Sequence, residues 1–262
     1  MTRWPTTAGS VYPSRFLHQY VAGQDATLTV AGRNVNMRAS KQDLRRNAEN
    51  AGGTKMKLLS APASPYGRKV KIVAIEKGLL DRIEVVAMPT TPATPNEQLA
   101  RDNPLAKIPT LVLSDGRSLY DSFVICDYLD TLHAGEKAIP AAGARRWAVL
   151  TVHALGSGIA DAAILCRYET ALRPEALRWA DWTRGQMKKV TGGLDWLDSN
   201  VAALGSAGAS DVDLGQIAVA CALGYLDFRF ADVDWRATRP RLAGWFAAFS
   251  QRASMRQTMP AA

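Results

Sequence analysis

One stretch decides the fold of this chain, residues 56–87, which read MKLLSAPASPYGRKVKIVAIEKGLLDRIEVVA. Residues 56–60 and 82–87 are short apolar runs typical of strands. Between them, Pro65 suits the first turn of a helix and Gly78 suits its end. A strand, a helix and a strand within about 30 residues predict a right-handed βαβ unit with parallel strands.

The helix predicted between these strands is apolar on two sides. Val70, Val73 and Ala74 recur at helical spacing, and Ile72 and Ile75 add a second apolar face. A helix of this kind is expected to be buried between a sheet and a further layer.

The segment up to residue 134 predicts a short helix at 96–101, two strands and a longer helix. The strands, at 110–113 and 117–120, flank Asp115 and Gly116, a dipeptide that supplies the positive φ of a hairpin turn. Asp121 or Ser122 caps the helix that follows and ends near Gly135. The order βαβ followed by ββα predicts a thioredoxin-like α/β domain, a mixed four-stranded sheet with helices on both faces.

After a linker at residues 134–143 the chain predicts an all-α helical bundle. Helical periodicity covers residues 145–167, 174–201, 213–230 and 240–252, without a convincing strand. Asp213 and Gln216 have the spacing of a capping box. We therefore predict a disordered extension over residues 1–55, a thioredoxin-like domain over 56–134 and an all-α domain over 145–262.

Composition excludes several classes of protein. The chain has 262 residues, 47% hydrophobic and 21% charged, which fits a globular protein of one or two domains. No apolar run reaches the ~18 residues of a membrane-spanning helix, and the N-terminus lacks the apolar core of a signal peptide. We expect a cytoplasmic protein. Cys126, Cys166 and Cys221 are widely spaced, without a C-x-x-C pair, and predict buried thiols and neither disulfides nor a zinc site.

The net charge of +8 is unevenly distributed. Residues 1–55 carry eight basic and three acidic side chains, a net of +5, which leaves +3 for the rest of the chain. A nucleic-acid-binding face needs a denser basic patch than that. We interpret residues 1–55 as an extension because no periodicity persists there, with Met56 as an alternative start of the chain. A basic tail that contacts partners is the other interpretation.

Three short motifs flank the predicted strands. They are Ser64-Pro65-Tyr66-Gly67-Arg68-Lys69-Val70 at the first helix, Asn103-Pro-Leu-Ala-Lys107-Ile108-Pro109-Thr110 before the hairpin, and Tyr120-Asp121-Ser122 after it. In the helical half, Asp213-x-x-Gln216 precedes Leu223-Gly-Tyr-Leu-Asp-Phe-Arg229. From Met56 to about Pro260 the sequence resembles the cytosolic glutathione transferases, in particular a bacterial serine-type member.

The resemblance implies a glutathione site at these motifs. The Ile108-Pro109 peptide is expected to be cis, which leaves the backbone N–H and C=O of Ile108 to pair with the cysteinyl part of glutathione. Ser122 is implied to bind the γ-glutamyl carboxylate through its hydroxyl and backbone N–H, and Asp121 to meet the ammonium. Lys107 is implied to offset the other carboxylate of the tripeptide.

Ser64 is the residue that the resemblance assigns to catalysis. Its hydroxyl, just before Pro65 at a helix start, is expected to donate a hydrogen bond to the glutathione sulfur and stabilise the thiolate, which is the nucleophile. Ser60 and Tyr66 are the alternative donors. A serine before a proline also commonly serves only as a helix cap.

Three functions compete at this stage. The first is a glutathione S-transferase, a cytoplasmic homodimer that conjugates glutathione, as co-substrate, to small hydrophobic electrophiles in detoxification. The second is a glutathione-dependent reductase or peroxidase, although Ser64 and Gly67 stand where that chemistry usually has C-x-x-C. The third is a non-catalytic glutathione-binding or assembly protein. No metal, nucleic acid or membrane is expected as a partner, and His18, His133 and His153 are expected in solvent or at helix ends.

Overall fold

The computed structural model describes residues 27–30, 33–36 and 55–260. Contacts divide the chain into two units, residues 1–50 and 51–262, and each is described by itself. In the first unit β1 (Thr27–Val30) and β2 (Arg33–Asn36) pair as an antiparallel hairpin. Sequence analysis predicted a disordered extension there and missed these strands, although Thr27, Thr29 and Val30 are β-branched. The remainder of residues 1–54, His18 included, lies outside the described residues.

The second unit contains a four-stranded mixed sheet. Its strands are β3 (Met56–Ser60), β4 (Ile83–Ala87), β5 (Thr110–Val112) and β6 (Ser118–Leu119), in the order β4-β3-β5-β6. β3 runs parallel to β4, and β5 is antiparallel to both β3 and β6. Gly116 has the positive φ of 84° that the hairpin between β5 and β6 requires. The predicted thioredoxin-like α/β arrangement is confirmed.

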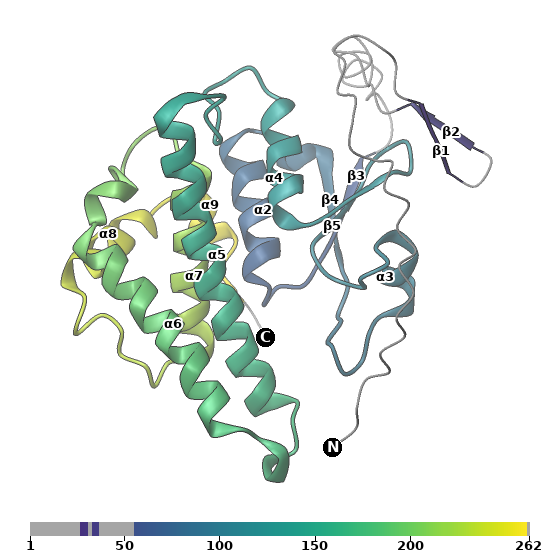
Figure 1. The fold of residues 1–262 in the computed structure, drawn as a ribbon. Helices are drawn as coiled ribbons and strands as arrows, with labels where there is room; N and C mark the ends of the chain where they lie inside the picture. The colour runs from purple at the N-terminus through teal and green to yellow at the C-terminus, as the bar shows by residue number, and fades with distance from the viewer. Residues whose placement is uncertain (1–26, 31–32, 37–54, 261–262) are drawn as a thin grey trace, which may run out of the picture. The chain divides into compact units, whose positions relative to one another are not determined.

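Helices cover both faces of this sheet. Figure 1 shows α2 (Pro65–Glu76) and α4 (Ser122–Thr131) between the sheet and the helical half, with α3 (Glu97–Asp102) on the other face. Neighbouring residues of β3 point to opposite faces: Leu58 joins the main core, whereas Leu59 packs with Met88 and Leu99. Because α2 also contacts α7, it is buried on two sides, as predicted from its two apolar faces.

The second half of the unit is all-α. Its helices are α5 (Gly143–Ala171), α6 (Ala180–Ser199), α7 (Leu214–Arg229), α8 (Pro240–Phe249) and α9 (Ala253–Gln257). Short 3-10 turns occupy Leu80–Arg82, Glu175–Leu177 and Val201–Leu204. The helix predicted from residue 174 begins only at Ala180, after one of these turns. The helix predicted over 240–252 is α8, which ends at Phe249, and the separate short helix α9 follows it. The capping box of Asp213 and Gln216 at the start of α7 is confirmed.

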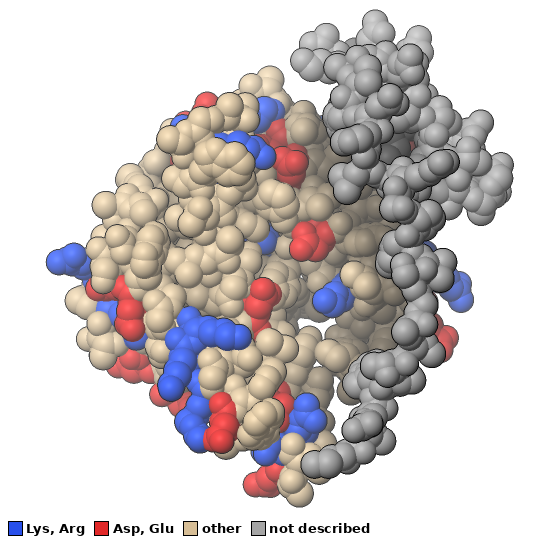
Figure 2. All heavy atoms as spheres, viewed as in Figure 1, with Lys and Arg blue, Asp and Glu red and all other residues tan. Residues whose placement is uncertain are grey.

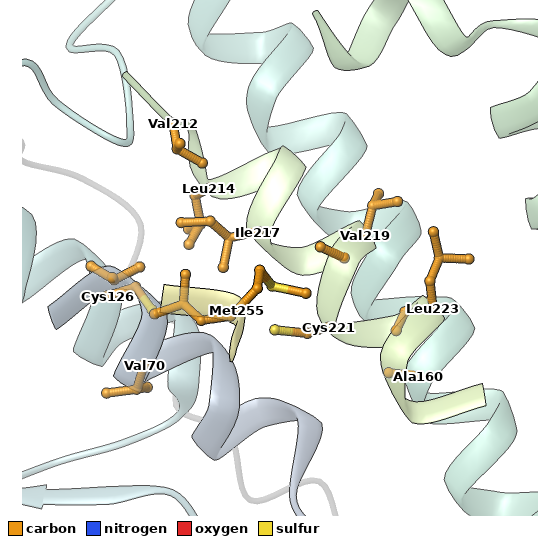
Figure 3. Packing of buried hydrophobic residues seen from close by; sticks show 14 of the residues in the cluster. Val70, Cys126, Ala160, Val212, Leu214, Ile217, Val219, Cys221, Leu223 and Met255 are labelled. Atoms are coloured by element: carbon orange, nitrogen blue, oxygen red, sulfur yellow. The ribbon is translucent and has the colours of Figure 1, made fainter. Parts of the chain in front are cut away.

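One apolar core joins the two halves of the unit. In Figure 3, Cys126 of α4 and Met255 of α9 lie on the side of Ile217 and Cys221 of α7, and Val70 of α2 belongs to the same cluster. All three cysteines are buried, as predicted. Burial raises the pKa of Cys126 to about 12 and that of Cys221 to about 11, so these thiols stay protonated at neutral pH.

Helix α5 is long and apolar enough to cross a membrane by length and composition alone, the one such helix in the part of the chain that the structure describes. Core helices pass the same test. Ile159, Ala160 and Ala163 of α5 are buried in the core just described. The apolar character of α5 is therefore accounted for by packing within the protein.

Charged side chains on the surface are mixed in sign. On the face drawn in Figure 2, Lys and Arg are interspersed with Asp and Glu. Ion pairs such as Arg117 with Asp115 at 2.7 Å and Arg145 with Glu136 at 3.5 Å are exposed. Pairs of this kind contribute about 0 to 1 kcal/mol each.

The pair between Glu76 and Arg252 is more enclosed and links α2 to the turn between α8 and α9. Arg252 donates from Nε and Nη2 to the two carboxylate oxygens of Glu76, at 3.0 and 2.9 Å. The Ser254 hydroxyl donates to the same carboxylate. Both charged side chains are only 15% exposed. The carboxylate of Glu76 therefore links the C-terminal segment around α9 to helix α2 of the thioredoxin-like half.

This linkage predicts a pH-dependent stability. Burial alone would raise the pKa of Glu76, but hydrogen bonds from Arg252 and Ser254 outweigh burial and hold the pKa below its usual value. The stabilisation is complete above the unfolded pKa of about 4.3 and is lost as pH falls through the lower folded pKa. We expect Glu76→Gln to lower the free energy of unfolding by about 1 to 3 kcal/mol near neutral pH, and by much less near pH 3. Urea unfolding of the wild type and Glu76→Gln at both pH values measures the difference in the free energy of unfolding. An equal difference at the two pH values would contradict the prediction.

Candidate functional site

Three segments of chain meet at one edge of the sheet. Leu59 pairs with Thr110, and Leu111 pairs with Leu119, so β3 and β6 end at the edge where β5 begins. Helix α2 follows β3 and α4 follows β6, so both helices begin there. Strand pairing thus brings the predicted residues 64, 107–109 and 121–122 to one edge.

Ser64 occupies the N-cap of α2. Its Oγ accepts a hydrogen bond from the backbone N–H of Gly67 at 3.1 Å, and Pro65 is the first residue of the helix. The side chain is half-buried. The residues that the structure describes provide no acceptor for the proton of this hydroxyl. A hydroxyl that accepts one hydrogen bond is a better donor of another, so the cap leaves Ser64 suited to donate outward.

The two alternative donors are placed differently. Ser60 is 1% exposed, and its Oγ is buried without a hydrogen-bond partner among the described residues. It lies under the first turn of α2, where a Cβ on Gly67 would collide with it. The Tyr66 hydroxyl already donates to Asp161 of α5, and burial together with this contact raises the pKa of Tyr66. This geometry favours Ser64, although its contact with sulfur remains a prediction.

The loop before β5 has the geometry that the resemblance implied. The Ile108-Pro109 peptide is cis, as predicted. Pro109 is buried, Ile108 is half-buried and Lys107 is exposed. Within residues 55–260, no hydrogen bond engages the backbone N–H or C=O of Ile108. Both groups can therefore pair with an extended peptide that lies along this edge.

Asn103 holds this loop in place, a role that was not predicted from the sequence. Its Nδ2 donates to the Lys107 carbonyl and to Thr110 Oγ1, both at 3.0 Å, and its Oδ1 accepts from the Leu105 N–H at 3.0 Å. Asn103 is almost fully buried. The Asn-Pro dipeptide at 103–104 is a turn signal that could have indicated such a role.

Asp121 and Ser122 open helix α4. Asp121 is the N-cap, and its Oδ1 accepts from the Phe123 N–H at 2.9 Å. Its side chain is exposed, whereas Ser122 is buried. One carboxylate oxygen of Asp121 is thus used as a cap, and Oδ2 stays available for a ligand. The start of α4 adds the partial positive charge of its helix dipole to this edge.

Two buried polar residues, Lys69 and His153, face each other between α2 and α5. Lys69 Nζ of α2 is 2.9 Å from His153 Nε2 of α5, and Ser157 Oγ lies 3.4 Å from each of these nitrogens. Burial, and then the charge of Lys69, lower the pKa of His153 to about 4. The expectation of a solvated or helix-end position for His153 is wrong, because Val149, Val152 and His153 share the inward stripe of α5. The expectation is confirmed for His133, which bonds to Asp130 at 2.9 Å at the end of α4.

Comparison with known proteins supplies the family. The model of the glutathione S-transferase N-terminal domain matches residues 63–132, and that of the C-terminal domain matches residues 180–248. An uncharacterized GST-like protein of Escherichia coli strain K12, YibF, is 32% identical over 205 residues, which cover 78% of this chain and 98% of the relative. The chain belongs to the glutathione S-transferase family.

Solved structures of other glutathione S-transferases agree with this fold. A family member from Pseudomonas fluorescens Pf-5, with bound glutathione, is 46% identical, covers 79% of this chain and all of its own, and has a TM-score of 0.76. One from Methylobacterium radiotolerans, in complex with glutathione sulfonate, is 36% identical over 80% of this chain and 96% of its own, with a TM-score of 0.70. The predicted family is confirmed; the serine-type subclass and the domain boundaries stay predictions.

The groups at the candidate site of this family member suit an organic ligand. Backbone amides, hydroxyls and single charged side chains gather at the edge, and the relatives just named hold glutathione or its sulfonate. Within the described part of the chain, no three His, Cys, Asp or Glu side chains are arranged to hold a metal ion.

Proposed function

We propose that this glutathione S-transferase conjugates glutathione, its co-substrate, to small hydrophobic electrophiles, with the glutathione thiolate as nucleophile. The observation that carries the proposal is the placement of Ser64, a half-buried hydroxyl that caps α2 and keeps its own proton to donate. Relatives crystallised with glutathione support the choice of co-substrate. We place the reaction in the cytoplasm, in detoxification.

The energy needed to form the thiolate matches what this arrangement supplies. A free thiol has a pKa of about 8.5. Lowering it by about two units requires about 2.7 kcal/mol in favour of the thiolate. A hydrogen bond to a charged group contributes about 1.5 to 3 kcal/mol, and a helix dipole about 0.3 to 1 kcal/mol. One Ser64 hydroxyl at the start of α2 is therefore sufficient, without a general base.

The remaining edge residues would position the tripeptide. The Ile108 backbone would pair with the cysteinyl residue, as an added strand does. Ser122 and the start of α4 would bind the γ-glutamyl carboxylate, and Asp121 Oδ2 would meet the ammonium. Lys107, exposed on the loop, would offset the glycyl carboxylate. Together these contacts would hold the sulfur at Ser64.

The electrophile would enter between α2 and the helical half. Tyr66, two residues after Ser64, reaches Asp161 of α5. Tyr168 of α5 and Tyr225 of α7 lie near enough to Tyr66 to raise its pKa. Tyr225 is buried, but Tyr66 and Tyr168 are half-buried, and rings of this kind favour aromatic electrophiles, which stack on them.

The rival functions find less support in these residues. A thiol reductase of this fold needs an accessible cysteine, whereas Cys126, Cys166 and Cys221 are all buried. A non-catalytic glutathione-binding or assembly protein would bind glutathione without turnover. Conjugation of a model aromatic electrophile separates this alternative from the proposed enzyme.

A homodimer is part of the proposal. Trp147 and Leu165 lie 18 residues apart on α5, which is five helical turns, so they share one face. Both are exposed, as is Val124 of α4. Exposed large apolar side chains on α4 and α5 support a two-fold contact. Light scattering that finds only monomers at micromolar concentration would contradict it.

Titration of bound glutathione tests the proposed function directly. We expect the wild-type protein to be retained on immobilised glutathione and to lower the pKa of the bound thiol by about two units, because Ser64 and α2 favour the thiolate. Ultraviolet absorbance of the thiolate, followed against pH, measures this shift. A bound thiol as weakly acidic as free glutathione would refute the enzymatic proposal and leave only binding.

A further inference from the structure

We propose that Lys69 is a specificity-determining residue for the γ-glutamyl carboxylate of glutathione. Its buried ammonium group, which no carboxylate among residues 55–260 contacts, would be balanced by the carboxylate of the ligand at the start of α4. The inference rests on the proposed function, since it concerns how the same site selects glutathione.

Lys69 is enclosed and has only neutral partners. It is 3% exposed, and its Nζ lies 2.9 Å from His153 Nε2 and 3.4 Å from Ser157 Oγ. None of the ion pairs in the described part of the chain includes Lys69. A buried ammonium without a counter-ion is costly, so such a group is usually retained for a reason other than packing.

His153 acts in this cluster as a hydrogen-bond acceptor. It is 8% exposed, and its lowered pKa of about 4 keeps the imidazole neutral at physiological pH. A neutral imidazole can accept at Nε2 while its proton is on Nδ1, and Lys69 donates to it. The ring of His153 lies 5.1 Å from that of Phe123, in the first turn of α4. His153 thereby holds the ammonium next to α4.

The positive charge of Lys69 reaches the second turn of α4. It partly counteracts the rise in pKa that burial causes at Cys126, which lies one turn after Ser122 on the same side of the helix. The dipole of α4 is also positive at this end. Two positive contributions within the first two turns of α4 favour an anion near its start, and Ser122 is where the γ-glutamyl carboxylate is expected.

Asp121 is not the counter-ion of Lys69. Its charge reaches His153, but its side chain is exposed and one oxygen caps the Phe123 N–H. The γ-glutamyl end of glutathione carries both an ammonium and a carboxylate. Asp121 matches the ammonium and Lys69 matches the carboxylate, so the pair would recognise an amino-acid head group as a whole.

The test compares two ligands and three proteins by isothermal titration calorimetry. The ligands are glutathione and 4-aminobutanoyl-cysteinylglycine, which lacks only the γ-glutamyl carboxylate. The proteins are the wild type, Lys69→Met and the control Lys71→Met, which removes a half-buried lysine of the same helix. We expect Lys69→Met to weaken glutathione binding roughly tenfold and to leave binding of the analogue unchanged, while Lys71→Met changes neither.

The outcomes separate the inference from the proposed function. Equal weakening of both ligands in Lys69→Met would show a merely structural role and overturn the inference, and so would unchanged glutathione binding. A wild-type protein that binds neither ligand would refute the proposed function as well. Thermal unfolding checks the fold, and Lys69→Met is expected not to lower the melting temperature, because His153 keeps Ser157 as a partner and a buried charge is removed. If Lys69→Met does not fold, Lys69→Gln takes its place in the same comparison.

Discussion

Ser64→Ala is expected to lower kcat for conjugation about a hundredfold while the affinity for glutathione changes by about twofold or less. The reason is that the Ser64 hydroxyl acts on the ionised sulfur, whereas the backbone of Ile108 and the residues that open α4 hold the rest of the tripeptide. Steady-state kinetics with an aromatic electrophile gives the rate, and calorimetry gives the affinity.

The controls for Ser64→Ala come from its neighbours. Ser60→Ala removes a buried hydroxyl without a described partner, so it is expected to keep the rate and to raise stability slightly. Ser64→Ala also removes a helix cap, at a cost of about 0.5 to 2 kcal/mol, which Ser64→Thr would largely restore. An unchanged rate in Ser64→Ala would show that another hydroxyl donates to the glutathione sulfur. Tyr66→Phe then tests whether Tyr66 is that donor.

Local patterns were enough to predict most of the fold. The βαβ unit follows from one apolar helix between two short apolar runs, and the hairpin follows from Asp115 and Gly116. The capping box at Asp213 sets the start of α7. Each of these is a contact between residues close in sequence, which is why periodicity and turn chemistry reveal it. Prediction of the site residues also needed the resemblance of three motifs to a known family.

Contacts between distant residues escaped prediction. Lys69 and His153 are 84 positions apart, and a lysine or histidine within a helix is ordinarily taken to face solvent. The sequence does contain a local indication that Lys69 is buried, because Lys69 lies three and four residues before Ile72 and Val73 and so falls on the apolar stripe of α2. The partner of Tyr66, 95 residues away on α5, carries no such signal. Tertiary packing alone brings these groups together.

Gly156→Ala is expected to be the most destabilising small substitution in the helical half. A Cβ at this position of α5 would lie 2.7 Å from the backbone nitrogen of Val219 and 2.8 Å from the carbonyl carbon of Ala218, both in α7. Backbone atoms of a packed helix cannot move aside singly, so α5 and α7 would have to separate. We expect a loss of about 2 to 4 kcal/mol in the free energy of unfolding, measured by urea denaturation.

Gly158→Ala is the matched control, because it lies in the same helix with nothing within 4 Å of an added Cβ. It is expected to stabilise the protein by about 0.5 to 1 kcal/mol, since alanine favours a helix more than glycine does. Similar stabilities of the two variants would contradict the close crossing of α5 and α7. His153 lies one turn before Gly156, so displacement of α5 would also draw it away from Lys69. Glutathione binding should therefore weaken in Gly156→Ala and persist in Gly158→Ala, which links the packing of the helical half to the selection of ligand at the sheet edge.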